Sequence, residues 1–199
     1  MKLLVATSNA GKMVEVREIL APLGFELLSL KEAALPSPDE NGVTFHDNAA
    51  AKATECAGQS GLWTLGDDSG LCVDALGGGP GVRSARYADG DLARRAKLIE
   101  ALKSVPEGRR GAHFFCAVAL SAPGGRQIFR AEGRVDGSIA REPRGENGFG
   151  YDPLFLPRET PGRTLAELES AEKNRLSHRG RALASLQPLL ERLARDGAL

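Results

Sequence analysis

The chain has 199 residues, enough for one large domain or for two small lobes that share a core. Hydrophobic residues make up 42% and charged residues 26%, a balance typical of a soluble globular protein rather than a disordered one. Lys plus Arg and Asp plus Glu both number 26, so the net charge is zero and gives no argument for a nucleic-acid or membrane partner. Any anion site must therefore be local.

The three cysteines, Cys56, Cys72 and Cys116, are too few for a disulfide framework and lack the spacing of a zinc site. We expect buried thiols in a reducing compartment. The N-terminal apolar run is too short for a signal peptide, and no stretch approaches the length of a membrane span. These features predict a cytoplasmic location.

The N-terminal part of the chain predicts alternating strands and helices. Lys2–Ala6 has the compact apolar pattern of a buried strand, and Met13–Leu20 has the spacing of an amphipathic helix. A second strand is expected over Phe25–Leu30. After a loop rich in proline and acidic residues, the alanine-rich segment Phe45–Ala53 predicts a helix that begins with a Thr-x-x-Asp capping pattern.

The middle of the chain predicts a strand that carries an Asp-Asp pair, followed by a flexible glycine-rich loop. The apolar spacing of Asp91–Val105 predicts a helix with its first residue as the N-cap. Two strands, His113–Leu120 and Gln127–Val135, are expected to form a hairpin.

The C-terminal part begins with a glycine-rich aromatic segment, Gly148–Pro153. Thr164 and Glu167 have the spacing of a capping box for a short helix. A last helix is expected from about Ser177, as its N-cap, to Arg195, with a bend or break near Pro188. The alternation of strands and helices predicts the α/β class, and the hairpin predicts a mixed sheet.

The polar segment Gly66-Asp67-Asp68-Ser69-Gly70 lies between two apolar runs. Adjacent buried carboxylates disfavour each other's charge unless a cation or hydrogen bonds compensate, and Mg²⁺ is a usual compensating ion. Taken alone, the segment fits a solvated polar turn better than a site. If the strand continues through it, the two Asp side chains point in opposite directions, and the spacing does not decide which one faces a site.

Two other segments could supply partners for a phosphate-bearing ligand. Thr7-Ser8-Asn9-Ala10-Gly11-Lys12 joins a strand to a helix, where backbone N–H groups and a lysine favour an anion, although an ordinary capped turn explains it equally well. The Walker A spacing is absent. Asp39 and Glu40 could join the Asp pair around Mg²⁺, although a solvated loop tip is the simpler explanation in isolation.

Two C-terminal segments could contact the rest of a nucleotide. The glycines beside Phe149 and Tyr151 would let a flat ligand approach closely, or the two rings are core residues of a turn. His178 and Arg179 lie at a predicted helix start, where the helix dipole opposes cations. A basic pair there indicates an anionic or carbonyl-bearing partner, or else a solvated helix start.

The order of these segments closely resembles the inosine triphosphate pyrophosphatase family over essentially the whole chain. The matching motifs are TSNAGK, the acidic loop followed by TFHDNA, DDSGLCVDALGGGPGVRSARY, REPRGENGFGYDP and SHRG. The resemblance implies Mg²⁺-dependent hydrolysis of ITP, dITP and XTP at the α–β phosphate bond, giving the nucleoside monophosphate and pyrophosphate and cleansing the nucleotide pool. It also implies a homodimer whose subunit, residues 1–199, is a single ITPase-like domain with two lobes around a central cleft, built from a mixed sheet with flanking helices.

The resemblance further implies roles for individual residues. Asp68 would accept the proton from water and bind the metal together with Asp39. Because Asp39 stands where the family usually has Glu, Glu40 is an alternative metal ligand. The implied substrate-binding residues are Thr7, Ser8, Asn9, Ala10, Gly11, Lys12, Ser69, Phe149, Gly150, Tyr151, Asp152, Lys173, His178 and Arg179. The alternatives are a nucleotide-binding sensor without catalysis and a hydrolase of modified pyrimidine triphosphates.

Overall fold

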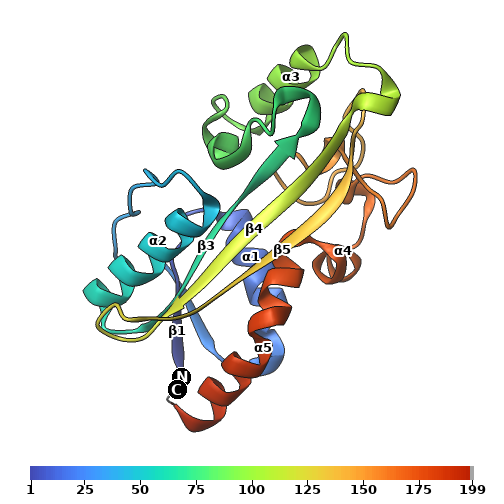
Figure 1. The fold of residues 1–199 in the computed structure, drawn as a ribbon. Coiled ribbons are helices and arrows are strands. Elements are labelled where there is room, and N and C mark those ends of the chain that lie inside the picture. The colour runs from blue at the N-terminus through green and yellow to red at the C-terminus, as the bar shows by residue number, and fades with distance from the viewer. Residues whose placement is uncertain (198–199) are drawn as a thin grey trace. The chain divides into compact units, whose positions relative to one another are not determined.

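A mixed six-stranded sheet is the centre of the computed structural model, which describes residues 1–197 (Figure 1). The strand order is β2-β1-β3-β4-β5-β6. Strand β1 pairs in parallel with β2 and β3, whereas β5 and β6 are antiparallel, which confirms the predicted α/β class and mixed sheet. The strands are β1 (Lys2–Val5), β2 (Glu26–Ser29), β3 (Trp63–Val73), β4 (Gly111–Ser121), β5 (Gln127–Ile139) and β6 (Phe155–Pro157).

Helices connect and flank these strands. The α-helices are α1 (Ala10–Leu20), α2 (Phe45–Ser60), α3 (Asp91–Ala101), α4 (Ser170–Leu176) and α5 (His178–Asp196). Short 3-10 turns occupy Ala21–Leu23, Asp74–Leu76, Gly81–Arg86, Glu107–Arg109, Asp152–Leu154 and Leu165–Glu167. Within residues 1–197, none of the helices combines the length and the apolar character needed to cross a bilayer.

Both predicted capping boxes are present. Thr44 and Asp47 cap α2 reciprocally, and Thr164 and Glu167 do the same for the short 3-10 turn Leu165–Glu167. The sequence did not predict strand β6 or helix α4. Pro188 lies inside α5, which continues past it, so the alternative of a break there is wrong.

The structure corrects two predicted helix starts. Helix α1 begins at Ala10 rather than Met13, because the Asn9 side-chain oxygen accepts a hydrogen bond from the Lys12 backbone N–H at 3.0 Å. The N-cap of α3 is Gly90, and Asp91 is already helical.

The chain divides into two compact units. Unit 1 comprises Met1–Asp68, Cys116–Gly133 and the segment that starts at Arg179, and unit 2 comprises Ser69–Phe115 and Arg134–His178. The predicted cleft between two lobes stays a prediction. The predicted domain also includes residues 198 and 199, which lie outside the described part of the chain.

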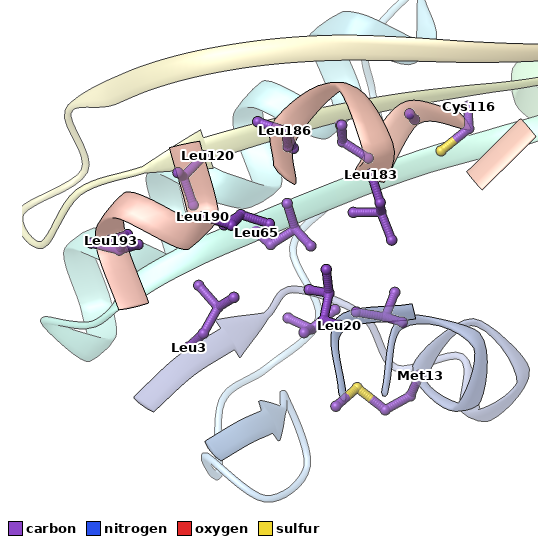
Figure 2. Close-up of a cluster of buried hydrophobic side chains, with 14 residues drawn as sticks. Leu3, Met13, Leu20, Leu65, Cys116, Leu120, Leu183, Leu186, Leu190 and Leu193 are labelled. Carbon is purple, nitrogen blue, oxygen red and sulfur yellow. The ribbon is translucent and has the colours of Figure 1, made fainter. Parts of the chain in front are cut away.

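Unit 1 has apolar side chains on both faces of its part of the sheet. Leu3 and Val5 belong to a cluster with side chains of α1 and α5 (Figure 2), whereas Leu4 and Ala6 belong to a second cluster with Cys56 of α2. Successive strand residues point to opposite faces, so β1 contributes to both clusters. Helices α1 and α5 therefore cover one face, and α2 covers the other.

Unit 2 has its own core. Leu98 of α3 packs there with Leu71 of β3, Phe114 of β4 and Val135 of β5. Tyr151 and Phe155 extend this core toward the C-terminal part of the unit. The glycine-rich aromatic segment is thus held in place by burial of its own Tyr151 and of Phe155, which follows it closely in the chain.

Helix α2 approaches β3 closely at Gly66. A Cβ atom at this position would collide with the carbonyl oxygen of Ala49 and crowd Ala53. The absence of a side chain at Gly66 is therefore what allows α2 to lie against the strand immediately before the Asp pair.

We expect Gly66→Ala to lower the free energy of unfolding by about 1–3 kcal/mol, because the backbone of α2 must shift to admit the methyl group. Gly58→Ala is the matched control. Its new Cβ would meet nothing within 4 Å, and the substitution removes a glycine from helix α2. The control should stabilise the protein by about 0.5–1 kcal/mol. Urea unfolding of the three proteins measures both effects, and equal stability of Gly66→Ala and wild type would contradict the close approach.

Candidate functional site

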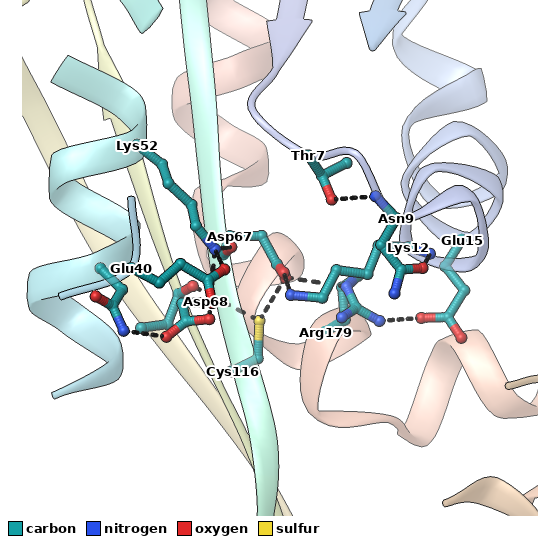
Figure 3. Close-up of polar contacts among 12 residues, drawn as sticks. Thr7, Asn9, Lys12, Glu15, Glu40, Lys52, Asp67, Asp68, Cys116 and Arg179 are labelled. Carbon is teal, nitrogen blue, oxygen red and sulfur yellow. Dashed lines mark hydrogen bonds and ion pairs between the residues drawn. The ribbon is translucent and has the colours of Figure 1, made fainter. Parts of the chain in front are cut away.

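Strand β3 continues through Asp67 and Asp68 without a turn, and both side chains are buried. The alternative of a solvated polar turn is therefore wrong. The two carboxylates have entirely different partners, as expected for successive residues of a strand. Asp67 contacts side chains of α1, β4 and α5, whereas Asp68 contacts side chains of α2 (Figure 3).

Three donors from three elements converge on the Asp67 carboxylate. Its Oδ1 pairs with the Lys12 ammonium, and its Oδ2 accepts from Arg179 Nε at 3.0 Å and from Cys116 Sγ at 3.1 Å (Figure 3). Burial opposes ionisation of Asp67, but the charges of Arg179 and Lys12 outweigh it and hold its pKa well below the usual value. Asp67 is therefore an anion at neutral pH.

Arg179 is almost completely buried, with 1% of its surface exposed. Its guanidinium lies between two carboxylates, because NH1 pairs with Glu15 of α1 while Nε bonds to Asp67 (Figure 3). Burial works against the charge of Arg179, but Asp67 and Glu15 more than offset this, so the pKa of Arg179 is raised. The pair of carboxylates makes the buried cation tolerable.

Asp68 lies against the buried face of α2. Asn48 Nδ2 donates to Asp68 Oδ2 at 2.9 Å, and Lys52 Nζ lies 3.4 Å from Asp68 Oδ1. Lys52 Nζ also donates to the Asp67 carbonyl oxygen at 3.2 Å and pairs with Glu40. Burial raises the pKa of Asp68 against the opposing attraction of Lys52 and Lys12, which makes this carboxylate a better proton acceptor than an ordinary one.

The structure distinguishes the two residues of the acidic loop. Glu40 is partly buried and shares Lys52 with Asp68, whereas Asp39 is exposed. Among residues 1–197, no three His, Cys, Asp or Glu side chains lie close enough together to hold a metal ion. Two carboxylates are nevertheless compatible with Mg²⁺, which usually takes one or two from the protein and completes its octahedron with water and substrate phosphate.

The Thr7–Lys12 segment forms the turn from β1 into α1. Thr7 Oγ1 accepts from the Asn9 backbone N–H at 3.2 Å, and the Asn9 side chain caps the helix. Ala10 and Gly11 lie in the first helical turn, where backbone N–H groups have no acceptor within the helix. This helix start and the Lys12 ammonium provide positive potential in unit 1.

A second group of predicted site residues comes together in unit 2. Asp152 Oδ2 accepts from the Phe149 backbone N–H at 2.8 Å and from Lys173 Nζ at 2.6 Å. The same ammonium lies 5.1 Å from the centroid of the Phe149 ring. Gly148 makes this arrangement possible, because it has φ +74° and a Cβ there would collide with the Asp152 carboxylate.

The neighbouring predicted residues have different surroundings. The Gly150 backbone is held on both sides, by Asp91 Oδ2 at 2.7 Å and Arg95 NH1 at 2.9 Å. Tyr151 is a core residue whose hydroxyl donates to the Ser84 carbonyl oxygen at 3.0 Å. The ring of the buried His178 stacks on Phe114 with centroids 4.7 Å apart, and Ser69 is half-buried on β3. The substrate-binding roles expected for these residues stay predictions.

The structure also shows functional candidates that the sequence reading missed. Asn48 and Lys52 are buried polar residues one turn apart on the alanine-rich face of α2. Their spacing among the alanines is visible in the sequence and could have indicated them. Glu15 and Cys116 gave no such signal. Their contacts with Arg179 and Asp67 join residues 164 and 49 positions apart, respectively, and depend on the packing of separate elements.

Comparison with known proteins gives one family. The model of the Ham1 family matches residues 3–189. A curated protein of Desulforamulus reducens named dITP/XTP pyrophosphatase is 48% identical and covers 97% of both chains. One of Mycobacterium tuberculosis with the same name is 51% identical, also over 97% of both chains. The solved structure of a HAM1 protein from Coxiella burnetii has a TM-score of 0.82 at 42% identity, covering 96% of this chain and 98% of that one.

We expect Asp67→Asn to lower the free energy of unfolding by about 3–5 kcal/mol, because the buried Arg179 loses half of its counter-charge. The amide can accept through one oxygen only, and its NH₂ group would face a cation or the thiol. Asp39→Asn is the control and should change stability by less than about 0.5 kcal/mol at its exposed position. Guanidinium unfolding provides the comparison, and similar small losses in both variants would rule out this role for the Asp67 charge.

Proposed function

Because the chain belongs to the Ham1 family, as the resemblance predicted, we propose that it hydrolyses dITP, XTP and ITP at the α–β phosphate bond, releasing the nucleoside monophosphate and pyrophosphate. The observation that carries the proposal is the pair Asp67–Asp68. The two buried carboxylates lie on opposite faces of β3, and each contacts one lysine, Lys12 for Asp67 and Lys52 for Asp68. Removal of non-canonical purine nucleotides from the cellular pool is the role that this activity would serve.

The charged groups of unit 1 suit a triphosphate. Hydrolysis of a phosphoanhydride needs cations that neutralise the phosphate oxygens, and Lys12 together with the α1 helix start supplies positive potential. It also needs a base for the attacking water. Asp68 is the candidate, since burial raises its pKa and Asn48 fixes the orientation of its carboxylate. In the proposed reaction water adds to phosphorus, the bridging P–O bond breaks, pyrophosphate leaves, and the water proton passes to Asp68.

Mg²⁺ is the proposed cofactor, held by Asp68 and Glu40. The fit rests on the Lys52 ammonium: both carboxylates contact it, so an oxygen of each is already directed toward one positive charge. The ion would supply charge neutralisation on the phosphates and orient the bond to be broken. Glu40 replaces Asp39 in the predicted ligand set because Asp39 is exposed, whereas Glu40 shares a partner with Asp68.

The purine base is assigned to the residues around Phe149 in unit 2. The Phe149 ring is half-exposed, and an aromatic face can stack on a base. Lys173 is a hydrogen-bond donor whose ammonium lies over the ring, and a donor suits the 6-carbonyl that hypoxanthine and xanthine carry. The predicted homodimer and the cytoplasmic location are also proposed, on the strength of the family resemblance.

The reaction is tested by incubating the protein with Mg²⁺ and XTP, dITP, ITP, ATP, GTP or a pyrimidine triphosphate, with separate assays for pyrophosphate and orthophosphate. We expect pyrophosphate from XTP, dITP and ITP. We expect Asp68→Asn to lower turnover by about a hundredfold or more while XTP still binds in calorimetry. Orthophosphate as the sole product would refute α–β cleavage. Binding without any product from the wild type would favour a sensor, and preferred cleavage of pyrimidine triphosphates would favour the other hydrolase.

The metal ligands are tested with Mn²⁺ as a paramagnetic substitute for Mg²⁺. We expect Glu40→Gln to weaken Mn²⁺ binding, measured by electron paramagnetic resonance, by about tenfold or more. Asp39→Asn provides the matched control on the same loop and should bind Mn²⁺ like the wild type. The reverse order of the two affinities would restore Asp39 as the ligand.

A further inference from the structure

The thiol of Cys116 is a hydrogen-bond donor to Asp67, a buried carboxylate of unit 1. Cys116 lies on β4, the strand next to β3, and has no exposed surface. Its Sγ is 3.1 Å from Asp67 Oδ2 and 3.8 Å from the Ala117 carbonyl oxygen. The nearer acceptor also carries a negative charge, which strengthens a hydrogen bond. The thiol therefore donates its hydrogen bond to Asp67 rather than to the Ala117 carbonyl oxygen.

The thiol stays protonated in these surroundings. Burial and the negative charge of Asp67 raise the pKa of Cys116 well above its usual value, despite the opposing charges of Arg179 and Lys12. Cys116 therefore offers a proton to the carboxylate at neutral pH rather than a second negative charge. Simple packing is the competing explanation, because Cys116 also belongs to the apolar cluster with Leu65.

The position of the thiol allows it to orient the Asp67 carboxylate, which apolar packing alone would not do. Asp67 Oδ2 has two donors, Cys116 and Arg179, whereas Oδ1 faces Lys12. Two donors on one oxygen fix the plane of the carboxylate and hence the direction of the other oxygen. One of them, Cys116, is carried by a strand of the central sheet on a short side chain.

The location of the Lys12 ammonium depends on the direction of Asp67 Oδ1. A lysine ammonium is a point charge on a flexible four-carbon stem, so its location is set by its partner. We propose that Cys116 is a positioning residue, whose S–H group orients Asp67 and thereby places the Lys12 ammonium for binding phosphate. The inference rests on the proposed function, in which Lys12 binds the phosphates of the substrate.

The hydrogen bond itself can be observed without turnover. The double variant Cys56→Ala/Cys72→Ala keeps Cys116 as its single thiol. We expect its infrared S–H stretching band to lie at lower frequency than the bands of Cys56 and Cys72, which appear as the difference between this variant and the wild type. A Cys116 band at the same frequency as the other two would overturn the inference.

The positioning role is tested by the affinity for inorganic pyrophosphate, measured by calorimetry, and by kcat/KM for XTP. We expect Cys116→Ala to lower both about tenfold, because a hydrogen bond to a charged group is lost. Cys116→Ser keeps a donor and should stay within about threefold of the wild type. Cys56→Ala, which removes a buried thiol from α2, is the control for loss of packing and should leave both quantities unchanged.

The possible outcomes separate this inference from the proposed function. If the wild type cleaves XTP but Cys116→Ala and Cys116→Ser behave alike, the positioning role is refuted and the proposed function stands. If the wild type neither cleaves XTP nor binds pyrophosphate, the proposed function and the role of Cys116 in phosphate binding both fail. A loss in Cys56→Ala as large as that in Cys116→Ala would assign the effect to packing.

Discussion

The compensation of the buried Asp67 carboxylate is the constraint on which the rest of unit 1 depends. A carboxylate with 1% exposed surface is strongly disfavoured as an anion unless cations and donors surround it. Here they come from α1, β4 and α5, so one side chain fixes three elements that are distant in the chain. Arg179, buried in turn, brings in Glu15 from the second turn of α1. Structural stability and the placement of Lys12 are therefore consequences of the same contacts.

Strand β3 turns this arrangement into a two-sided site. The alternation of its side chains sends Asp67 toward α1 and α5 and Asp68 toward α2, and Gly66 lets α2 approach closely enough for Lys52 to reach both the Asp68 carboxylate and the Asp67 carbonyl oxygen. The opposite pKa shifts of the two neighbours follow from their surroundings. Asp67 has two close cations and a depressed pKa, whereas Asp68 has an amide and a more distant ammonium, so that burial dominates and its pKa is raised. A permanently charged anchor and a proton acceptor can thus stand side by side.

Unit 2 uses a carboxylate in a similar way. Asp152 holds the Phe149 backbone and the Lys173 ammonium, and the left-handed conformation of Gly148 leaves room for both. The aromatic ring and the cation are therefore fixed relative to each other within unit 2. In the proposed function this arrangement would present a stacking face and a donor together, which is what a purine base with a 6-carbonyl requires.

The sequence by itself determined the α/β class, the mixed sheet, both capping boxes and the family, because periodicity, capping spacing and long motifs are local properties. Its errors in the α1 and α3 starts are local too, since a cap is decided by one side chain or one glycine. Only the tertiary structure decided that Asp67 and Asp68 continue a buried strand, that Glu40 rather than Asp39 shares Lys52 with Asp68, and that Cys116 and Glu15 complete the network. These features depend on which side chains come into contact when the helices and strands pack. The free-energy cost of burying a charge is set by those tertiary contacts rather than by neighbours in the chain.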